Sequence, residues 1–348
     1  MHHYKREILP SPTEAVTAGV CNFGTFSSEI KKINLLETRR PLGLPLPTKL
    51  NNFRLKEWEA IQLLCEHWFF CIAVYNTKTI GTAIIMAFNR QTERMYVYQH
   101  KVPFWKLTTP SGLTDSHYYY HSPHLTLDIK NQLQTHKVTV SFSANHFKNQ
   151  PNLQGTFCGH YLTEPIVTIS PLGDNRPLYS HKALMTAEGY VYINNKKFNY
   201  ASEHTCMIMD DHKGFYPYTM QYDWATALGR GSEGILQGFN LTNNQVKDQE
   251  QFNENCLWFD GKMYPLPPIS IVRPQGVQGK WQIKDSYKLI DLTFTPRADV
   301  LNYLNLGLIK TRYHGPTGLF SGFIKTVDGP TVCFDGFVGM GEKKYIRM

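Results

Sequence analysis

Three pairs of short runs in the second half of the chain are each separated by two residues that favour a tight turn. Asn194-Asn195 separates 189–193 from 196–200. Asp260-Gly261 separates 255–259 from 262–264, and Asp328-Gly329 separates 323–327 from 331–334. Such residues adopt the left-handed backbone of a two-residue hairpin turn with little strain. Three hairpins in succession predict a β-meander or a β-barrel.

The first half continues this rhythm with apolar or alternating runs separated by turn residues: 68–75, 82–88, 94–99, 125–129 and 138–142. This pattern is typical of antiparallel β-structure. The prolines within 42–47 predict an extended arm. Residues 55–64 are the one ambiguous element, because Leu55, Trp58, Ile61 and Leu64 lie three apart and fit a short helix.

Length and loop composition predict two domains. A chain of 348 residues corresponds to about two domains of ordinary size. The most loop-like interior segment is 165–177, which contains Pro171, Gly173, Asp174 and Asn175. We therefore expect an N-terminal β-domain with its extended arm at 1–170 and a C-terminal β-domain at 171–348. Aromatic residues make up 13% of the chain and charged residues only 18%, which favours strands and predicts an all-β protein.

Several functional classes are disfavoured by the composition. No window holds the roughly 20 consecutive apolar residues of a membrane helix. The first residues lack the apolar core of a secretory signal, and seven cysteines without a C-x-x-C pair are typical of reduced thiols. We therefore expect a cytoplasmic protein. The net charge is +8, but its basic pairs are scattered, so we expect no nucleic-acid partner.

Neither a metal nor a cofactor is expected. The histidines at 117, 121 and 124 have helical spacing, but three tyrosines and a proline disfavour a helix there. Residues 229–234 match G-x-G-x-x-G, yet a strand and not a helix is predicted to follow, so a hairpin loop is the better interpretation.

The window 209–229 holds the best candidate for a ligand pocket. Read as a strand, it places Tyr218, Met220, Tyr222, Trp224 and Thr226 on one face. Aromatic rings with hydroxyl and indole donors can line a pocket. The same row also fits ordinary barrel core.

Two carboxylates near this row are candidates for proton transfer. Asp210 can act as an acid or base at a pocket rim if burial raises its pKa. The alternative interpretation is that Asp210 lies in a solvated turn before Gly214. Glu254, in the polar Asn253-Glu254-Asn255 island, would be its counterpart if the two meet in space.

Taken together, several ordered motifs resemble the bacterial family catalogued as domain of unknown function 2804. They are Ser180-His-Lys-Ala183, the Asp-x-x-x-Gly-x-x-Pro segment from Asp210 to Pro217, Tyr222-Asp-Trp-Ala225, Asn240, Glu254-Asn255 followed by Asp260-Gly261, 292–296, and Gly341-Glu342. Tyr222 stands where members usually show Trp, and the tail after Glu342 lacks the expected His and Trp. That family is similar in fold to the AttH and carotenoid 1,2-hydratase group. The resemblance implies two lipocalin-like antiparallel β-barrel or sandwich domains around a small-molecule pocket.

The resemblance directs attention to Lys182, Asp210, Trp224, Asn240, Glu254, Asn255 and Glu342. Our leading hypothesis is an enzyme that hydrates, isomerises or cyclises a small, partly apolar molecule. Asp210, Glu254 and Lys182 would be catalytic, while Tyr218, Tyr222, Trp224, Asn240, Asn255 and Glu342 would bind the ligand. A non-catalytic carrier of a lipid or other hydrophobic ligand, and a glycoside-processing enzyme with paired carboxylates, are the alternatives.

Overall fold

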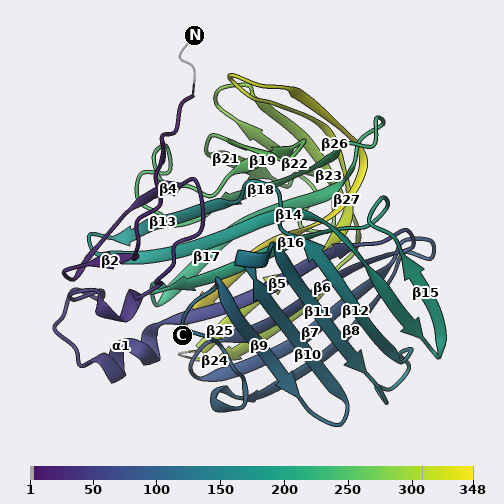
Figure 1. Cartoon of the computed structure of the whole chain (residues 1–348), viewed down its shortest axis with the longest axis horizontal. Helices are drawn as coiled ribbons and strands as arrows, with labels where there is room; N and C mark the ends of the chain where they lie inside the picture. The colour runs from purple at the N-terminus through teal and green to yellow at the C-terminus, as the bar shows by residue number, and fades with distance from the viewer. Residues whose placement is uncertain (1–3, 308, 348) are drawn as a thin grey trace.

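The computed structural model describes residues 4–307 and 309–347, and it is built almost entirely of β-strands (Figure 1). Most strands belong to two large, curled sheets. The first sheet contains β1 (Ile8–Leu9), β4 (Gly24–Phe26), β5 (Lys56–Leu64), β6 (Trp68–Asn76), β7 (Ile80–Asn89), β8 (Arg94–Pro103), β9 (Asp115–His121), β10 (Leu125–Gln132), β11 (Lys137–Ala144), β12 (Leu153–His160), β13 (Ile166–Gly173), β14 (Arg176–Ile193), β15 (Lys196–Tyr200) and β16 (Cys206–Gly214).

The second sheet begins after a four-residue connection. It contains β17 (Thr219–Arg230), β18 (Leu236–Asn243), β19 (Cys256–Phe259), β20 (Lys262–Pro265), β21 (Ile269–Val272), β22 (Trp281–Asp285), β23 (Ile290–Ala298), β24 (Leu301–Leu306), β25 (Ile309–His314), β26 (Thr317–Lys325) and β27 (Thr331–Arg347). A separate small hairpin pairs β2 (Val16–Thr17) with β3 (Val20–Cys21). The sheets therefore change over at 215–218, while the predicted division of folding units at residue 170 stays a prediction.

Helical segments are few and short: α1 (Thr48–Arg54) and the single 3₁₀ turns η1 (Leu35–Glu37), η2 (Phe104–Lys106) and η3 (Leu133–Thr135). Within the described part of the chain, no helix has the length and apolar character needed to cross a membrane. The predicted all-β class is confirmed.

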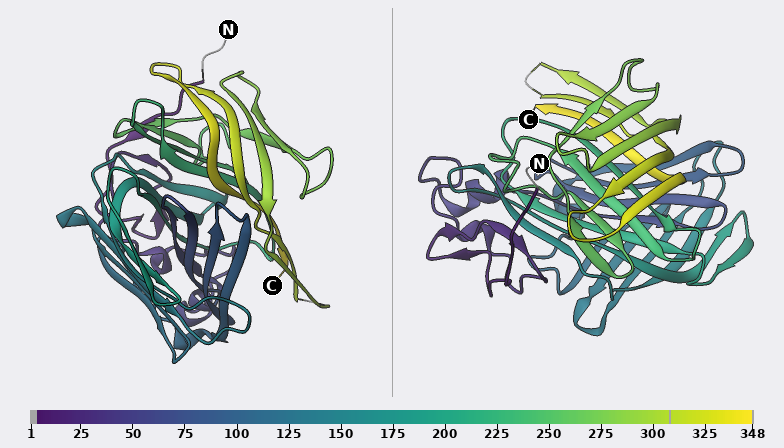
Figure 2. Two further views of the ribbon diagram at one scale, coloured as in Figure 1. Left: turned by 90° about the vertical axis from the view of Figure 1, so that its right-hand side faces the viewer. Right: turned by 90° about the horizontal axis from the view of Figure 1, so that it is seen from above.

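The two sheets curl separately and lie against each other, as the left view of Figure 2 shows. Each strand alternates its side chains between two faces. On β5, Ile61 and Leu63 enter the core of the first sheet, whereas Ala60 and Leu64 enter a second core shared with β17 and β27. The second sheet encloses its own core around Trp281. A strand buried on both faces therefore separates the first core from the inter-sheet layer.

Two of the three predicted tight turns are confirmed. Asn194, Asn195, Asp260 and Gly261 all have positive φ, as a two-residue hairpin turn requires. The third hairpin pairs Lys325 with Thr331, so its connection is the five-residue loop 326–330. The prediction of a two-residue turn at Asp328-Gly329 is therefore wrong. The five earlier strands are confirmed, and the hairpin loop predicted at 229–234 lies at 231–235, because β17 continues to Arg230.

Two other local expectations are wrong. The helix considered for 55–64 is strand β5, and α1 lies just before it. The three-residue spacing was misleading because β5 is buried on both faces and so lacks simple alternation. The loop expected at 165–177 is mostly strand β13, and only Asp174 and Asn175 form the turn into β14.

A buried carboxyl pair lies within the first core. Glu59 on β5 and Asp211 on β16 are cross-strand neighbours, and both are fully buried. Asn131 donates to both Glu59 oxygens at 2.8 and 3.0 Å, and the Tyr118 hydroxyl donates to Asp211. Burial raises the pKa of Asp211 to about 6, only partly offset by Lys213, and burial with Asp211 nearby raises that of Glu59. Each carboxyl of the pair therefore keeps its proton to a higher pH in the folded protein than in the unfolded chain.

We expect Asp211→Asn to change how stability depends on pH. A carboxyl with a raised folded pKa binds more protons when folded, so its contribution to stability falls as pH rises from about 3.8 to about 6. As the pH rises across this window, the free energy of unfolding of the variant should increase by roughly 1–3 kcal/mol relative to that of the wild type. Urea unfolding at several pH values measures this difference. The exposed control Asp335→Asn should show no such trend, and a flat difference for Asp211→Asn would contradict the assignment.

Candidate functional site

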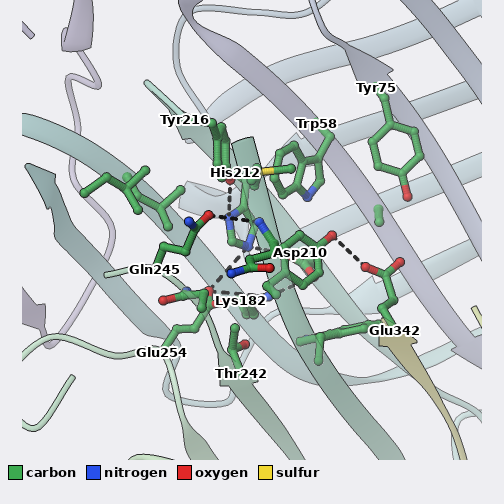
Figure 3. Close-up of a pocket in the computed structure, with 18 of the residues that line it drawn as sticks. Trp58, Tyr75, Lys182, Asp210, His212, Tyr216, Thr242, Gln245, Glu254 and Glu342 are labelled. Carbon is green, nitrogen blue, oxygen red and sulfur yellow. Dashed lines mark hydrogen bonds and ion pairs between the residues drawn. The ribbon is translucent and has the colours of Figure 1, made fainter. Parts of the chain in front are cut away.

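A pocket lies in the layer between the two sheets, where β5, β14 and β16 face β17, β18 and β27 (Figure 3). Its cavity volume is about 50 Å³. The pocket is therefore narrow. Its lining includes Trp58, Gln62, Tyr75, Lys182, Asp210, His212, Tyr216, Met220, Tyr222, Trp224, Thr242, Gln245, Glu254 and Glu342.

One wall of the pocket is charged although it is buried. Lys182 on β14 and Asp210 on β16 are cross-strand neighbours, and Lys182 Nζ donates to Asp210 Oδ2 at 2.9 Å. Glu254, just before β19 in the other sheet, places Oε2 3.6 Å from the same ammonium. All three are at most 5% exposed. The two predicted carboxylates therefore meet, and Lys182 is the cation that joins them.

His212 completes this cluster from the same face of β16. Its Nε2 lies 3.0 Å from Asp210 Oδ1 and 3.4 Å from Glu254 Oε2. The contact with Asp210 lacks hydrogen-bond alignment, because Asp210 Oδ1 has no hydrogen-bond partner among the described residues. Nε2 is instead 3.2 Å from Ser180 Oγ, whose hydroxyl donates to Glu254 at 2.5 Å. Since Ser180 has one proton, it accepts from His212 Nε2 in this arrangement.

The imidazole ring is fixed on its other sides by aromatic residues. Trp58 stacks on His212 with centroids 4.6 Å apart and also stacks on Tyr216 at 5.3 Å. The Tyr216 hydroxyl lies 3.5 Å from His212 Nδ1. With Nε2 carrying the proton to Ser180, Nδ1 is an acceptor for this hydroxyl. Burial raises the pKa of Tyr216, and nearby Glu254 adds to this effect, so Tyr216 keeps its proton.

The charges in the cluster stabilise one another. Burial raises the pKa of Asp210, but Lys182 and His212 outweigh it and lower the net value to about 2. Glu254 behaves similarly, because Lys182 and His212 outweigh burial and its pKa is lowered. Burial lowers the pKa of Lys182, but Asp210 and Glu254 raise it above its usual value. At neutral pH, both carboxylates and the ammonium are therefore ionised.

The opposite end of the pocket presents a carboxylate bound by phenols. Glu342 on β27 accepts from the Tyr222 and Tyr313 hydroxyls, both at 2.7 Å. Trp224 lies between the two ends, and its indole donates to Asn240 at 2.7 Å. The Lys182 ammonium lies 5.5 Å from the Trp224 ring. Figure 3 shows Glu342 on one side and the Lys182 cluster on the other.

The segment that carries Glu254 is fixed by hydrogen bonds from three directions. Asn240 Nδ2 donates to the Glu254 carbonyl at 2.7 Å. Asn255 Oδ1 accepts from the Thr242 amide at 2.6 Å. Arg6, from the early part of the chain, donates to the carbonyls of Asn253 at 2.8 Å and Asn255 at 2.7 Å. Asn240 and Asn255 therefore position Glu254 and do not line the pocket.

The structure thus brings six of the nine predicted site residues to one pocket: Lys182, Asp210, Tyr222, Trp224, Glu254 and Glu342. Tyr218 lies just before β17, is 46% exposed and is absent from the lining. The solvated turn considered for Asp210 is wrong, because Asp210 lies within strand β16. His212, Trp58 and Tyr216 are lining residues that the sequence analysis missed. His212 follows Asp210 by two positions, so strand alternation alone would have placed it on the same face.

Among the described residues, no group of three or more His, Cys, Asp or Glu side chains is arranged to hold a metal ion. The ammonium of Lys182 lies between the carboxylates of Asp210 and Glu254, where a cation would otherwise bind.

Comparisons with known proteins identify the fold and a family. A sequence profile of the family described as "Domain of unknown function (DUF2804)" matches residues 13–348. No curated protein matches the chain. Structures of CghA with Sch210972 (TM-score 0.54) and of CghA alone (0.51) each share 10% identity and cover 84% of this chain and 88% of theirs. Kievitone hydratase from Nectria haematococca has the same coverage, with 9% identity and a TM-score of 0.50. At this identity, the likeness shows the fold, and the predicted two lipocalin-like β-domains are confirmed.

We expect Lys182→Met to destabilise the protein strongly. Removing the ammonium leaves two buried carboxylates without their shared cation, which costs about 3–5 kcal/mol in comparable cases. Urea unfolding at pH 7 measures the loss. Lys182→Met combined with Asp210→Asn and Glu254→Gln should recover most of it, because no buried charge is then left uncompensated. A triple variant no more stable than Lys182→Met would show that the ion cluster is not the cause.

Proposed function

Because the chain belongs to the DUF2804 family and its pocket places a histidine beside buried carboxylates, we propose that it is an enzyme that performs acid–base chemistry on a small, partly apolar organic molecule. Hydration, isomerisation and cyclisation are the reactions that this site supports. The observation that carries the proposal is His212, whose Nε2 is hydrogen-bonded to Ser180 and lies beside Asp210, while its Nδ1 contacts Tyr216. A histidine beside buried carboxylates in a sheltered cleft is a common proton-transfer group.

The roles within the cluster follow from the pKa directions. We infer that His212 and Tyr216 exchange protons with the substrate, since Tyr216 lines the pocket and holds its hydroxyl proton. Asp210 and Glu254 are more acidic than usual, so they favour the ionised form and serve to orient His212 and balance its charge. The hypothesis that Asp210 itself is the acid or base depended on a raised pKa. Its lowered pKa instead supports a positioning role.

The remaining lining groups suggest how a substrate is held. Trp58, Tyr222 and Trp224 supply flat apolar surfaces on which an unsaturated or ring compound can stack. Gln62 Oε1 and Thr242 Oγ1 are buried pocket atoms without a hydrogen-bond partner among the described residues. Buried polar atoms are normally satisfied, so we propose that they bind hydroxyl or amide groups of the ligand.

The similar structures are compatible with this proposal. One is named as a hydratase, and another contains the small molecule Sch210972. We infer from this that the shared fold can present a small-molecule site. We also propose a cytoplasmic location, supported by the seven cysteines, none of which forms a disulfide.

A carrier of a hydrophobic ligand is the second candidate, favoured by the largely aromatic and aliphatic lining. Native mass spectrometry of protein purified from its host tests it, since a stoichiometric unaltered lipid would support the carrier. The glycoside-processing alternative is less well supported. Glycoside hydrolysis needs one carboxyl with a raised pKa to act as acid, whereas the pKa values of Asp210 and Glu254 are both lowered.

We expect His212→Gln to reduce turnover about 10²- to 10⁴-fold, which is the usual contribution of a general acid or base. A panel of unsaturated and hydroxylated ring compounds would be incubated with the protein in ¹⁸O-labelled or deuterated water. Mass spectrometry then detects hydration as added labelled water and isomerisation as deuterium uptake, while a changed retention time detects cyclisation.

The matched control is His204→Gln, which alters an exposed histidine away from the pocket and should keep wild-type turnover. Tyr216→Phe should lose activity without losing stability comparable to that of Lys182→Met. Full turnover in both His212→Gln and Tyr216→Phe would rule out the proposed mechanism.

A further inference from the structure

A second pocket adjoins the first across β17. Its volume is about 420 Å³, and it shares four lining residues with the first pocket: Gln221, Tyr222, Asn244 and Gln245. The two pockets are therefore adjacent, and the second is the wider one. The second pocket lies where β17, β25 and β27 run side by side in the second sheet.

The lining of this second pocket is strongly basic. Lys310 and Arg312 come from β25, while Lys343 and Lys344 come from β27. None of these four takes part in an ion pair among the residues that the structure describes. Strand alternation places Lys310, Arg312 and Lys343 on one face of the sheet and Lys344 on the other. Three cations with no carboxylate partner therefore create a positive potential in this concave site.

The one carboxylate in the lining is already bound elsewhere. Asp223 is the cross-strand neighbour of Lys343, but its Oδ1 accepts from Arg273 at 2.9 Å. Arg273 is itself fixed, with its guanidinium 3.9 Å from the centre of the Trp281 ring. Asp223 therefore neutralises Arg273 and leaves Lys310, Arg312 and Lys343 uncompensated.

Lys344 has an unusual environment for a lysine. Its Nζ lies 5.3–5.7 Å from the centroids of four rings, those of Trp58, Tyr75, Tyr222 and Tyr313. Nζ makes no hydrogen bond among the described residues. Burial lowers its pKa, and Glu342 only partly offsets this. Ring faces stabilise a cation, yet three N–H donors are left for an acceptor.

We propose that this second pocket binds an oxyanion group of the substrate, a carboxylate or a phosphate, while the rest of the molecule occupies the first pocket beside His212. The idea deepens the proposed function and rests on it for the reacting end of the substrate. Lys310, Arg312 and Lys343, which share one face of the sheet, would contact the anion. Lys344 projects from the opposite face, so its ammonium lies on the side of the first pocket. Charge-assisted hydrogen bonds from Lys and Arg are the usual means of binding such groups.

Probe ligands that share one ring but differ in charge test the proposal directly. Isothermal titration calorimetry would compare benzoate and phenyl phosphate with neutral benzyl alcohol, and would include inorganic phosphate. We expect the anionic ring compounds to bind about tenfold or more tightly than benzyl alcohol. Whichever of benzoate and phenyl phosphate binds better identifies the anion class.

The double variant Arg312→Ala/Lys343→Ala should weaken both anionic probes about tenfold and leave benzyl alcohol unchanged. Both side chains are exposed, so the fold should survive, which circular dichroism and the melting temperature verify. Lys280→Ala, which removes an exposed charge just before β22, is the matched control and should behave like the wild type.

Equal affinity for charged and neutral probes, unchanged affinity in the double variant, or no anion binding by the wild type would each overturn the anion site. These outcomes are separate from failure of the proposed function. If His212→Gln keeps full turnover while the double variant loses anion binding, the second pocket is an anion site of a protein whose chemistry lies elsewhere.

Discussion

Three buried charges hold the functional layer of this protein together. Burying the charges of Lys182, Asp210 and Glu254 away from water costs free energy, and their attraction for one another offsets this cost. Two of them belong to the first sheet, and Glu254 belongs to the second. The docking of the sheets is therefore more than an apolar contact, because it brings a second carboxylate to a lysine that already holds one. The same cluster contacts the Nε2 edge of His212, which is opposite the Nδ1 edge that contacts Tyr216.

Strand alternation places the neighbouring residues Asp210 and Asp211 in two different environments. Asp210 and Asp211 are adjacent, so they point to opposite faces of β16. Asp210 enters the inter-sheet pocket, where cations lower its pKa, while Asp211 enters the first core beside Glu59, where burial raises its pKa. The chemical difference between two identical side chains thus comes entirely from the sheet face on which each one lies.

Local signals predicted much of the fold, and distant contacts account for what was missed. Asn194-Asn195 and Asp260-Gly261 predicted their turns because left-handed backbone is a property of those residues. Residues 55–64 were ambiguous because burial on both faces of β5 comes from the second sheet, which no local pattern encodes. At the site, motifs pointed to Lys182, Asp210 and Glu254. Trp58 went unrecognised because its role depends on pairing between β5 and β16, strands about 150 residues apart in sequence.

The hydrogen bonds of Arg6 have a consequence for how the chain is made. Arg6 is synthesised long before Asn253 and Asn255, yet it donates to the carbonyls of both. A growing chain completes every strand through β16 before those residues leave the ribosome. During that interval Arg6 lacks these two acceptors and Lys182 lacks the Glu254 carboxylate, although β1 can already pair with β4 and β4 with β13. Emergence of the 253–255 segment therefore supplies both the carbonyls that Arg6 binds and the second carboxylate beside Lys182.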